Sequence, residues 1–328
     1  MPSLIRSVLL GVLGCAVLSI SLASANEARH IAMVALVEKP WAVALDITGY
    51  NIHIDGVTPD GRRYLFATNA ATSMTLSVTL EMVGRQATGQ GCLAHLQQIA
   101  QASLANNSQN FRQYEVRHMP VIEYVGPAVR GGDVNHFHVF ACAGKENVYT
   151  DVHISKKSFT SGDESLVRDV LASLDIVAAA PASSLDHFRA GSAPYLQKQY
   201  AQAIPHYEQA LALEQSNPTL DKSLWHLLIH NLGMAYHMTG DLPQARIVFE
   251  YGISQDPDNP LYHYNLARTY AGMNDRDHAM QSLHAAFYNR HQNGNEKLPD
   301  PRQDMSFRRF MLDPSFRSLA ESLMQPAI

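Results

Sequence analysis

The sequence predicts an α+β N-terminal domain, an antiparallel sheet with helices, followed by an all-α array of helical hairpins. Three observations carry this prediction. Met74–Glu81 alternates strictly between apolar and polar residues, as a strand with one buried face does. A helical segment at Asn231–Tyr236 returns 34 residues later at Asn265–Tyr270. Between the two halves, residues 177–184 are small, uncharged and include a proline, which is typical of a linker.

Residues 26–176 form the predicted α+β domain. Besides Met74–Glu81, we expect five further strands, at Trp41–Ile47, Tyr64–Thr68, Pro120–Val125, His136–Ala143 and Val148–Ser155. Two segments carry apolar residues at helical spacing, Cys92–Leu104 and Glu164–Leu174. Many strands with only two helices favour an antiparallel sheet over a doubly wound parallel sheet. This pattern resembles the PsbP/Mog1-like α/β/α domains, and the resemblance implies a small layered domain.

Internal repetition defines the C-terminal half. The motif at Asn231–Tyr236 is followed by an alanine at Ala245, which returns as Ala279. An earlier copy is visible at Tyr200–Leu211, where the second helix of a hairpin is expected. Its first helix contains Pro194 and is therefore expected to be kinked or short. About eight extra residues separate this copy from the next one.

These residues resemble the tetratricopeptide repeat (TPR) position by position. The resemblance assigns Leu232, Gly233 and Tyr236 to the first helix of one repeat, and Ala245 and Phe249 to its second helix. It implies about three repeats over residues 185–292, with capping helices over 293–328. Each hairpin has an apolar face that only its neighbours cover, so the repeats must stack.

The resemblance also implies a protein or peptide partner, because the first helices of TPR hairpins line a groove that holds peptides. The groove positions of this sequence are Arg189, His230, Asn231, His237, Tyr264, Asn265 and Arg268. Paired asparagines could hydrogen-bond an extended peptide backbone, and the two arginines could pair with a carboxylate. The full lysine-rich clamp of chaperone-binding members is missing, which argues against recognition of a Glu-Glu-Val-Asp tail.

The N-terminus has the layout of a secretory signal peptide. Arg6 precedes an apolar run from Val8 to Ala23, and Ala23-Ser24-Ala25 offers a small-x-small cleavage pattern. Residues 1–25 are therefore expected to be removed, leaving no stable membrane span; a retained anchor or lipidation at Cys15 is the alternative. We expect an exported protein of the periplasm or cell envelope, or a secreted one. A formal net charge of -5 argues against nucleic acid as a partner.

Removal of Cys15 would leave two cysteines, Cys92 and Cys142. In an oxidising compartment this pair predicts a disulfide, which would close a loop of about 50 residues and stabilise the fold by about 4 kcal/mol. The alternative is catalytic. Cys92 opens a helix, where the dipole favours a thiolate, and His136 or His138 would be the base of a cysteine-dependent hydrolase.

The 16 histidines suggest one further alternative, a ligand- or metal-binding N-terminal domain. His136 and His138 share a strand face, and His118 and His153 lie on segments that could be neighbours. Three imidazoles could hold zinc, but no cysteine or carboxylate ligand follows from the spacing. No serine nucleophile elbow, phosphate loop or paired-carboxylate motif stands out. The sequence therefore predicts a binding protein, not an enzyme, with no metal and no cofactor.

Overall fold

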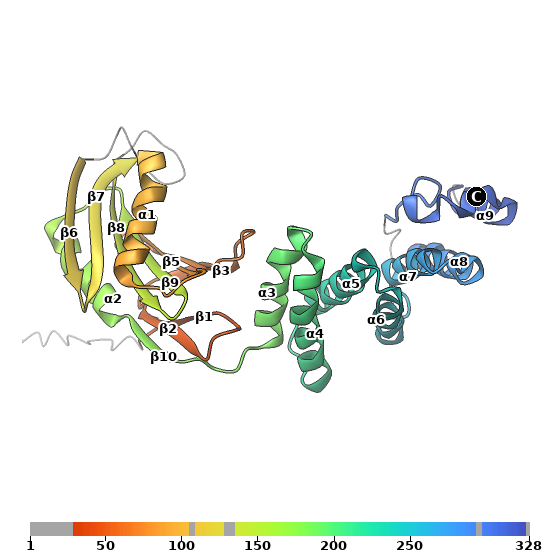
Figure 1. Cartoon of the computed structure of the whole chain (residues 1–328), viewed down its shortest axis with the longest axis horizontal. Helices are drawn as coiled ribbons and strands as arrows, with labels where there is room; N and C mark the ends of the chain where they lie inside the picture. The colour runs from red at the N-terminus through yellow and green to blue at the C-terminus, as the bar shows by residue number, and fades with distance from the viewer. Residues whose placement is uncertain (1–28, 105–108, 128–134, 293–296, 326–328) are drawn as a thin grey trace, which may run out of the picture.

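The computed structural model describes residues 29–104, 109–127, 135–292 and 297–325. An α+β domain comes first, and a row of helices extends from it to the C-terminus (Figure 1). The predicted fold class is therefore confirmed. The expected signal peptide, residues 1–25, lies outside the described residues.

The larger sheet of the N-terminal domain has seven antiparallel strands in the order β3-β4-β5-β9-β8-β7-β6. In β5 the side chains of Met74, Leu76, Val78 and Leu80 are buried on one face, as the alternation predicted. The strands are β3 (Asn51–Val57), β4 (Arg63–Asn69), β5 (Met74–Met82), β6 (Gln109–Val116), β7 (Met119–Pro127), β8 (Asn135–Lys145) and β9 (Val148–Lys156).

A second, three-stranded sheet covers one face of the first. It consists of β1 (Ile31–Ala35), β2 (Trp41–Asp46) and β10 (Asp175–Ala178), paired in the order β1-β2-β10. Side chains of both sheets, with those of α2 (Ser161–Ser173), form the main core of the domain. The helix α1 (Gly89–Leu104) packs on the opposite face, against β7, β8 and β9 (Figure 1).

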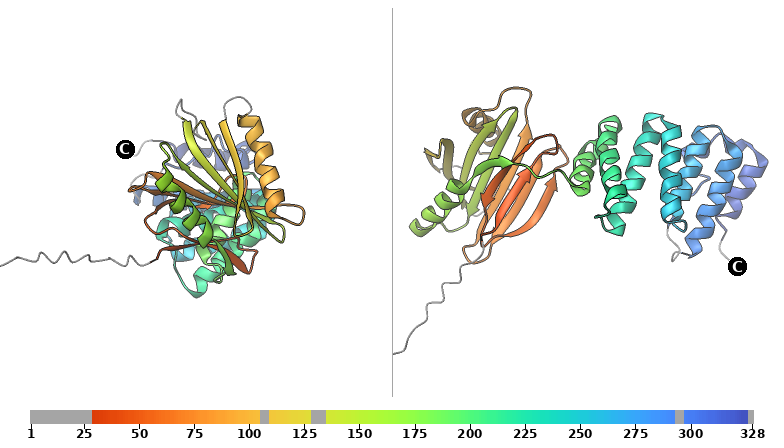
Figure 2. Two further views of the ribbon diagram at one scale, coloured as in Figure 1. Left: turned by 90° about the vertical axis from the view of Figure 1, so that its left-hand side faces the viewer. Right: turned by 90° about the horizontal axis from the view of Figure 1, so that it is seen from below.

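Six helices after β10 pair into three consecutive hairpins (Figure 2). The first helix of each hairpin is α3, α5 or α7, and the second is α4, α6 or α8. Pro194 stands near the end of α3, and the extra residues before the second hairpin lengthen α4 and α5 and form the loop 217–221. The helices are α3 (Ser184–Leu196), α4 (Tyr200–Ser216), α5 (Lys222–Thr239), α6 (Leu242–Gln255), α7 (Pro260–Gly272) and α8 (Arg276–Gln292).

A glycine lets the two helices of a hairpin approach closely. A Cβ on Gly233 would lie 2.5 Å from two ring atoms of Phe249, which belongs to the partner helix. The same relation recurs one hairpin earlier, where a Cβ on Gly191 would lie 2.8 Å from the Tyr207 ring. The small residue and the aromatic ring are thus one packing unit, which explains why both recur in the sequence.

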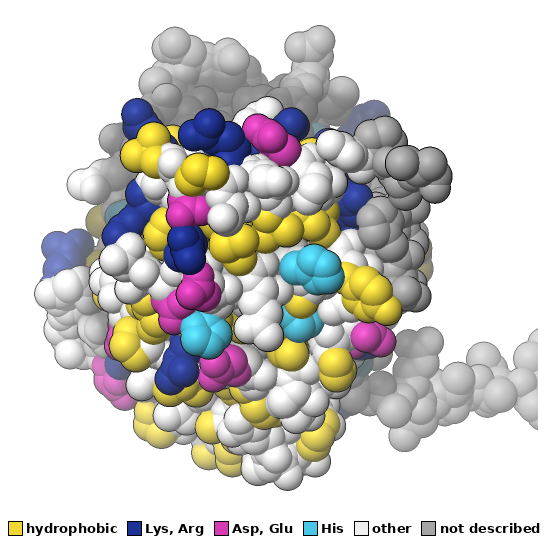
Figure 3. Space-filling view, turned by 90° about the vertical axis from the view of Figure 1, so that its right-hand side faces the viewer, with side chains coloured by type: hydrophobic (Ala, Val, Ile, Leu, Met, Phe, Trp, Pro, Cys, Tyr) yellow, Lys and Arg dark blue, Asp and Glu magenta, His cyan; other side chains and the backbone are white. Residues whose placement is uncertain are grey.

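The C-terminal residues cap the array. Two 3₁₀ turns, η1 (Met305–Phe307) and η2 (Phe310–Leu312), lead into α9 (Pro314–Ser322). Phe307 and Phe316 are fully buried and join the core of the last hairpin. Viewed end on, this part of the surface shows hydrophobic side chains mixed with charges of both signs (Figure 3). No helix within the described ranges is long and apolar enough to cross a membrane.

Candidate functional site

The helical array places the predicted peptide-binding residues on its first helices. Arg189 lies on α3; His230, Asn231 and His237 lie on α5; Tyr264, Asn265 and Arg268 lie on α7. The first helices contact one another along the array, α3 with α5 and α5 with α7. We call the side chains of α3, α5 and α7 at these positions the first-helix face.

The two asparagines of the first-helix face bond to the protein itself. Asn231 Nδ2 donates to the Tyr207 hydroxyl of the preceding hairpin at 3.2 Å, and Asn265 Nδ2 lies 3.1 Å from His230 Nδ1. Both asparagines are buried. Burial, with the Arg268 charge nearby, lowers the pKa of His230, so its Nδ1 is a hydrogen-bond acceptor at neutral pH. These amides therefore join successive hairpins.

Tyr264 and Arg268 hold the C-terminal cap. The Tyr264 hydroxyl donates to Asp304 Oδ2 at 3.0 Å, and Arg268 Nε lies 3.3 Å from the same oxygen. Burial and the neighbouring Asp304 carboxylate raise the pKa of the Tyr264 hydroxyl. From the sequence, Arg268 was expected to pair with a carboxylate of a ligand. In the structure it already pairs with the carboxylate of Asp304.

Apolar side chains occupy the accessible part of the first-helix face. On α5, Leu227 is 46% exposed and Met238 is 54% exposed. Leu227 is three residues before His230 and Met238 is seven residues after Asn231, spacings that place them on one side of the helix. Sequence reasoning named the polar residues of this side and missed the apolar ones, although the same spacing could have found them. At the end of α3, Leu196 is 69% exposed.

His237 completes the α5 part of this face. Its Nδ1 lies 3.5 Å from the Thr269 hydroxyl of α7. Burial, together with the Arg268 charge, lowers the pKa of His237 despite the opposing effect of Asp304. His230 and His237 are therefore neutral at pH 7, and this part of the face carries little net charge beyond the Arg268–Asp304 pair.

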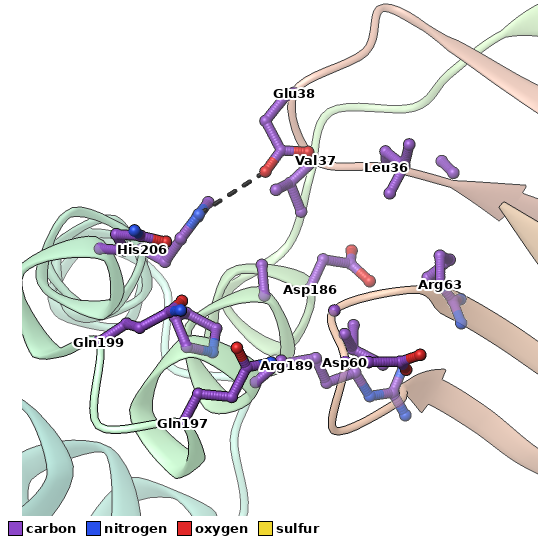
Figure 4. Close-up of a pocket in the computed structure, with 17 residues that line it drawn as sticks. Leu36, Val37, Glu38, Asp60, Arg63, Asp186, Arg189, Gln197, Gln199 and His206 are labelled. Atoms are coloured by element: carbon purple, nitrogen blue, oxygen red, sulfur yellow. Dashed lines mark ion pairs between the residues drawn. The ribbon is translucent and has the colours of Figure 1, made fainter. Parts of the chain in front are cut away.

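Arg189 lies apart from the other six residues, at the junction between the array and the N-terminal domain. Its Nη1 is 3.5 Å from Asp55 Oδ2 on β3, and Asp55 also pairs with Arg63 of β4. The side chain extends from α3 toward the turn between these two strands (Figure 4). Sequence reasoning placed Arg189 with Arg268 because it could not foresee that a strand pair would meet α3.

The junction contains a cavity of about 260 Å³ between α3, the start of α4 and two turns of the N-terminal domain (Figure 4). His206 Nε2 of α4 forms an ion pair with Glu38 Oε1 at 3.6 Å across it. On the other side of the cavity, the Gln197 amide donates to the Pro59 carbonyl. These contacts orient the two domains, and small polar interfaces of this kind permit relative motion.

The two cysteines lie together beneath α1. Cys92 is 1% exposed, Cys142 is fully buried, and both are free thiols in the structure. The Cys92 thiol donates to the Thr150 carbonyl at 3.5 Å. The disulfide stays a prediction. The proposed bases of a Cys92 hydrolase are engaged elsewhere, since His138 Nδ1 lies 3.0 Å from His153 Nε2 and His136 stacks on His138.

The histidines of the sheet do not form a metal site in the described part of the chain, where no group of three or more His, Cys, Asp or Glu could hold a metal ion. His138 and His153 pair with each other on β8 and β9. Burial, with His138 nearby, lowers the pKa of His153 to about 3. His118 lies in the turn between β6 and β7, at a φ of 66°.

Comparison with known proteins gives partial structural likenesses. No family model matches the chain, and no curated protein matches it. PcrH, solved in complex with the chaperone binding region of PopB, matches at a TM-score of 0.30 and 16% identity, over 43% of this chain and 90% of that one. The MamA protein matches at 0.30 and 21%, over 42% of this chain and 66% of that one. The Sgt2 TPR domain from Aspergillus fumigatus matches at 0.31 and 22%, over 44% and 86%.

Proposed function

We propose that this chain is an exported protein that binds another protein or a peptide along its first-helix face, and that it serves as an assembly or scaffold factor of the periplasm or cell envelope. The observation that carries the proposal is the exposed apolar surface of Leu227 and Met238 on α5, beside Asn231, whose amide is already bonded within the protein. Exposed apolar patches on a protein surface mark sites of interaction with other proteins.

The proposed partner segment is apolar and weakly charged. An acidic tail would need a free cation, but Arg268 is engaged by Asp304, and His230 and His237 are neutral at pH 7. Binding of an apolar segment is favoured because it buries the side chains of Leu227 and Met238. The ring nitrogens of His230 and His237 can form hydrogen bonds with the backbone of that segment. The proposal therefore names an apolar segment in place of a carboxylate and keeps the expectation of a peptide.

The cellular setting of the proposal comes from the N-terminal residues. The basic, apolar and small-residue pattern of residues 1–25 supports export and cleavage. Export would restrict the partner to proteins that are themselves exported or that reach the same compartment.

The test is affinity capture with the chain from residue 26 as bait in an envelope extract. Leu227→Ser and Met238→Ser should each lose the specific partners, because both side chains are exposed and their replacement leaves the core intact. Ile247→Ser is the matched control, since Ile247 is 49% exposed on the second helix α6. If all three variants capture the same proteins as wild type, the first-helix face is not the binding surface. Circular dichroism confirms that each variant is folded.

A further inference from the structure

A half-buried carboxylate lies directly opposite one of the two cysteines. Asp151 on β9 and Cys142 on β8 are paired across the two strands, with their side chains on the face that α1 covers. Asp151 Oδ1 has almost no solvent contact and no hydrogen-bond partner among the described residues. A buried polar atom without a partner is costly, so its presence calls for an explanation in function.

The thiols are arranged as a chain that ends beside this carboxylate. The Cys142 thiol donates a hydrogen bond to Cys92 Sγ, and the Cys92 thiol donates to the Thr150 carbonyl. The contact with Cys92, followed by burial and the charges of Cys92 and Asp151, raises the pKa of Cys142. Cys142 is therefore a poor nucleophile unless a neighbouring base takes its proton.

Cys92 lies on the covering helix α1, whereas Cys142 lies on the sheet beneath it. Cys92 lies in the first turn of α1, after the exposed residues Thr88 and Gln90, and a helix start favours a thiolate. Gly91 allows this turn to pack closely, because a Cβ there would lie 2.8 Å from the Tyr149 hydroxyl. A small outward movement of this turn would expose Cys92 before Cys142.

We propose that Cys92 and Cys142 form a reversible internal disulfide and that the Asp151 carboxylate accepts the proton of Cys142 when the bond closes. The oxidant is a disulfide, either a small molecule or the active-site disulfide of an oxidoreductase. Cys92 first releases its proton to solvent, and the resulting thiolate attacks the oxidant, forms a mixed disulfide and displaces one thiolate, which takes up a proton. Cys142 then gives its proton to Asp151 and attacks Cys92 Sγ, which displaces the second thiolate. Two protein thiols are oxidised, and the disulfide oxidant is reduced to two thiols.

The surroundings of Asp151 suit a proton acceptor. Burial raises the pKa of Asp151 to about 7. The Arg62 charge lowers this pKa, and the Glu81 charge raises it. The ionisable groups that face Asp151 or Cys142 include Arg62 before β4, Glu81 on β5, Tyr124 on β7, Cys142 on β8 and Cys92 on α1. A base whose pKa lies near the working pH is the most effective proton acceptor.

The closed bond would fasten α1 to the sheet. The side chains under α1 form a small cluster of their own, separate from the main core of the domain. A covalent link from the first turn of α1 to the middle of β8 would therefore hold a part of the domain that has little other apolar support.

The test follows oxidation of the reduced chain by oxidised glutathione between pH 6 and pH 9, with alkylation of remaining thiols and intact mass measurement. Wild type should lose both thiols, and its closure rate should level off above pH 7 as Asp151 ionises. Asp151→Asn should close about 10-fold or more slowly near pH 7 and accelerate steadily up to pH 9. Asp169→Asn is the matched control, because Asp169 is exposed on α2 at the opposite face of the sheet, and it should keep the wild-type profile.

Three outcomes overturn the proposal. Persistent thiols in wild type refute the disulfide. If the disulfide of Asp151→Asn closes as fast as that of wild type or faster, Asp151 is not the proton acceptor. A stable mixed disulfide at Cys142 in Cys92→Ser, without one at Cys92 in Cys142→Ser, reverses the order of attack. Because Asp151→Asn removes a half-buried charge and keeps the size of the side chain, it should remain folded, and circular dichroism before oxidation verifies this.

Discussion

The close approach of α5 and α6 at Gly233 allows a quantitative prediction for Gly233→Ala. The new Cβ would lie 2.5 Å from two ring atoms of Phe249 and 2.9 Å from a third. Carbon atoms prefer a separation of about 3.5–4.0 Å, so the helices would have to move apart by about 1 Å. Phe249 is fully buried and has no free space into which its ring could retreat.

Two opposing contributions set the magnitude. Alanine is favoured over glycine inside a helix by about 1 kcal/mol. Overpacking a filled core costs about 1–3 kcal/mol, and three clashing ring atoms place this site near the upper end. We therefore expect Gly233→Ala to lower the free energy of unfolding by about 2 kcal/mol and the Tm by about 5 °C. Urea and thermal denaturation followed by circular dichroism measure both quantities.

Two further variants identify the clash as the cause. Gly162→Ala in α2 is the control, because its Cβ would meet only the Thr160 hydroxyl at 3.8 Å, and it should be neutral or slightly stabilising. Phe249→Leu should rescue Gly233→Ala, since the third hairpin has Ala267 and Leu283, both fully buried, at the corresponding positions. A Gly233→Ala protein as stable as wild type, or a double variant without rescue, would refute the reasoning.

Three further predictions concern single side chains. Glu214→Ala should destabilise the array by about 2 kcal/mol in urea unfolding, because its buried carboxylate accepts the Ser184 hydroxyl at 2.5 Å. Burial raises the pKa of Glu214, but its hydrogen bonds lower it more, so this stabilisation is present above the unfolded-state pKa and is lost in acid. Arg189→Ala breaks the contact with Asp55 and should broaden the interdomain distances measured by spin-label spectroscopy, with at most about 1 kcal/mol lost because the pair is partly exposed. Phe307→Ala should cost about 3 kcal/mol and speed hydrogen exchange in α7 and α8 while leaving the N-terminal sheet unchanged.

Local sequence patterns predicted the elements in which apolar and polar residues alternate or in which a motif repeats. The alternation of β5 and the 34-residue repeat of α5 and α7 are examples. The strand β3 was missed because its sequence contains an aspartate and a glycine, and its pairing with β4 is irregular between Ile52 and Ile54. Such a strand is specified by its neighbour, which no local pattern reveals.

The candidate site shows the same limit at the level of side chains. Sequence reasoning found the residues of the first-helix face but could not assign their partners. Asn231 bonds to Tyr207 and Arg268 pairs with Asp304, and both partners lie on other elements, more than twenty residues away in the chain. These contacts give Asn231 and Arg268 partners within the protein, while Leu227 and Met238 beside them are exposed.

The two ends of the array are closed by different physical means, and this difference has a functional consequence. At the C-terminal end, buried aromatic side chains such as Phe307 and Phe316 close the last hairpin, so this cap belongs to the fold. At the N-terminal end, the ion pair of His206 with Glu38 and the pair of Arg189 with Asp55 span a cavity, so the α+β domain is attached by polar contacts. Polar contacts at a partly open junction are weaker than a buried apolar core. We therefore expect the α+β domain to shift relative to the hairpins while the first-helix face keeps its shape, so that the partner proposed for this face would be presented at more than one angle to that domain.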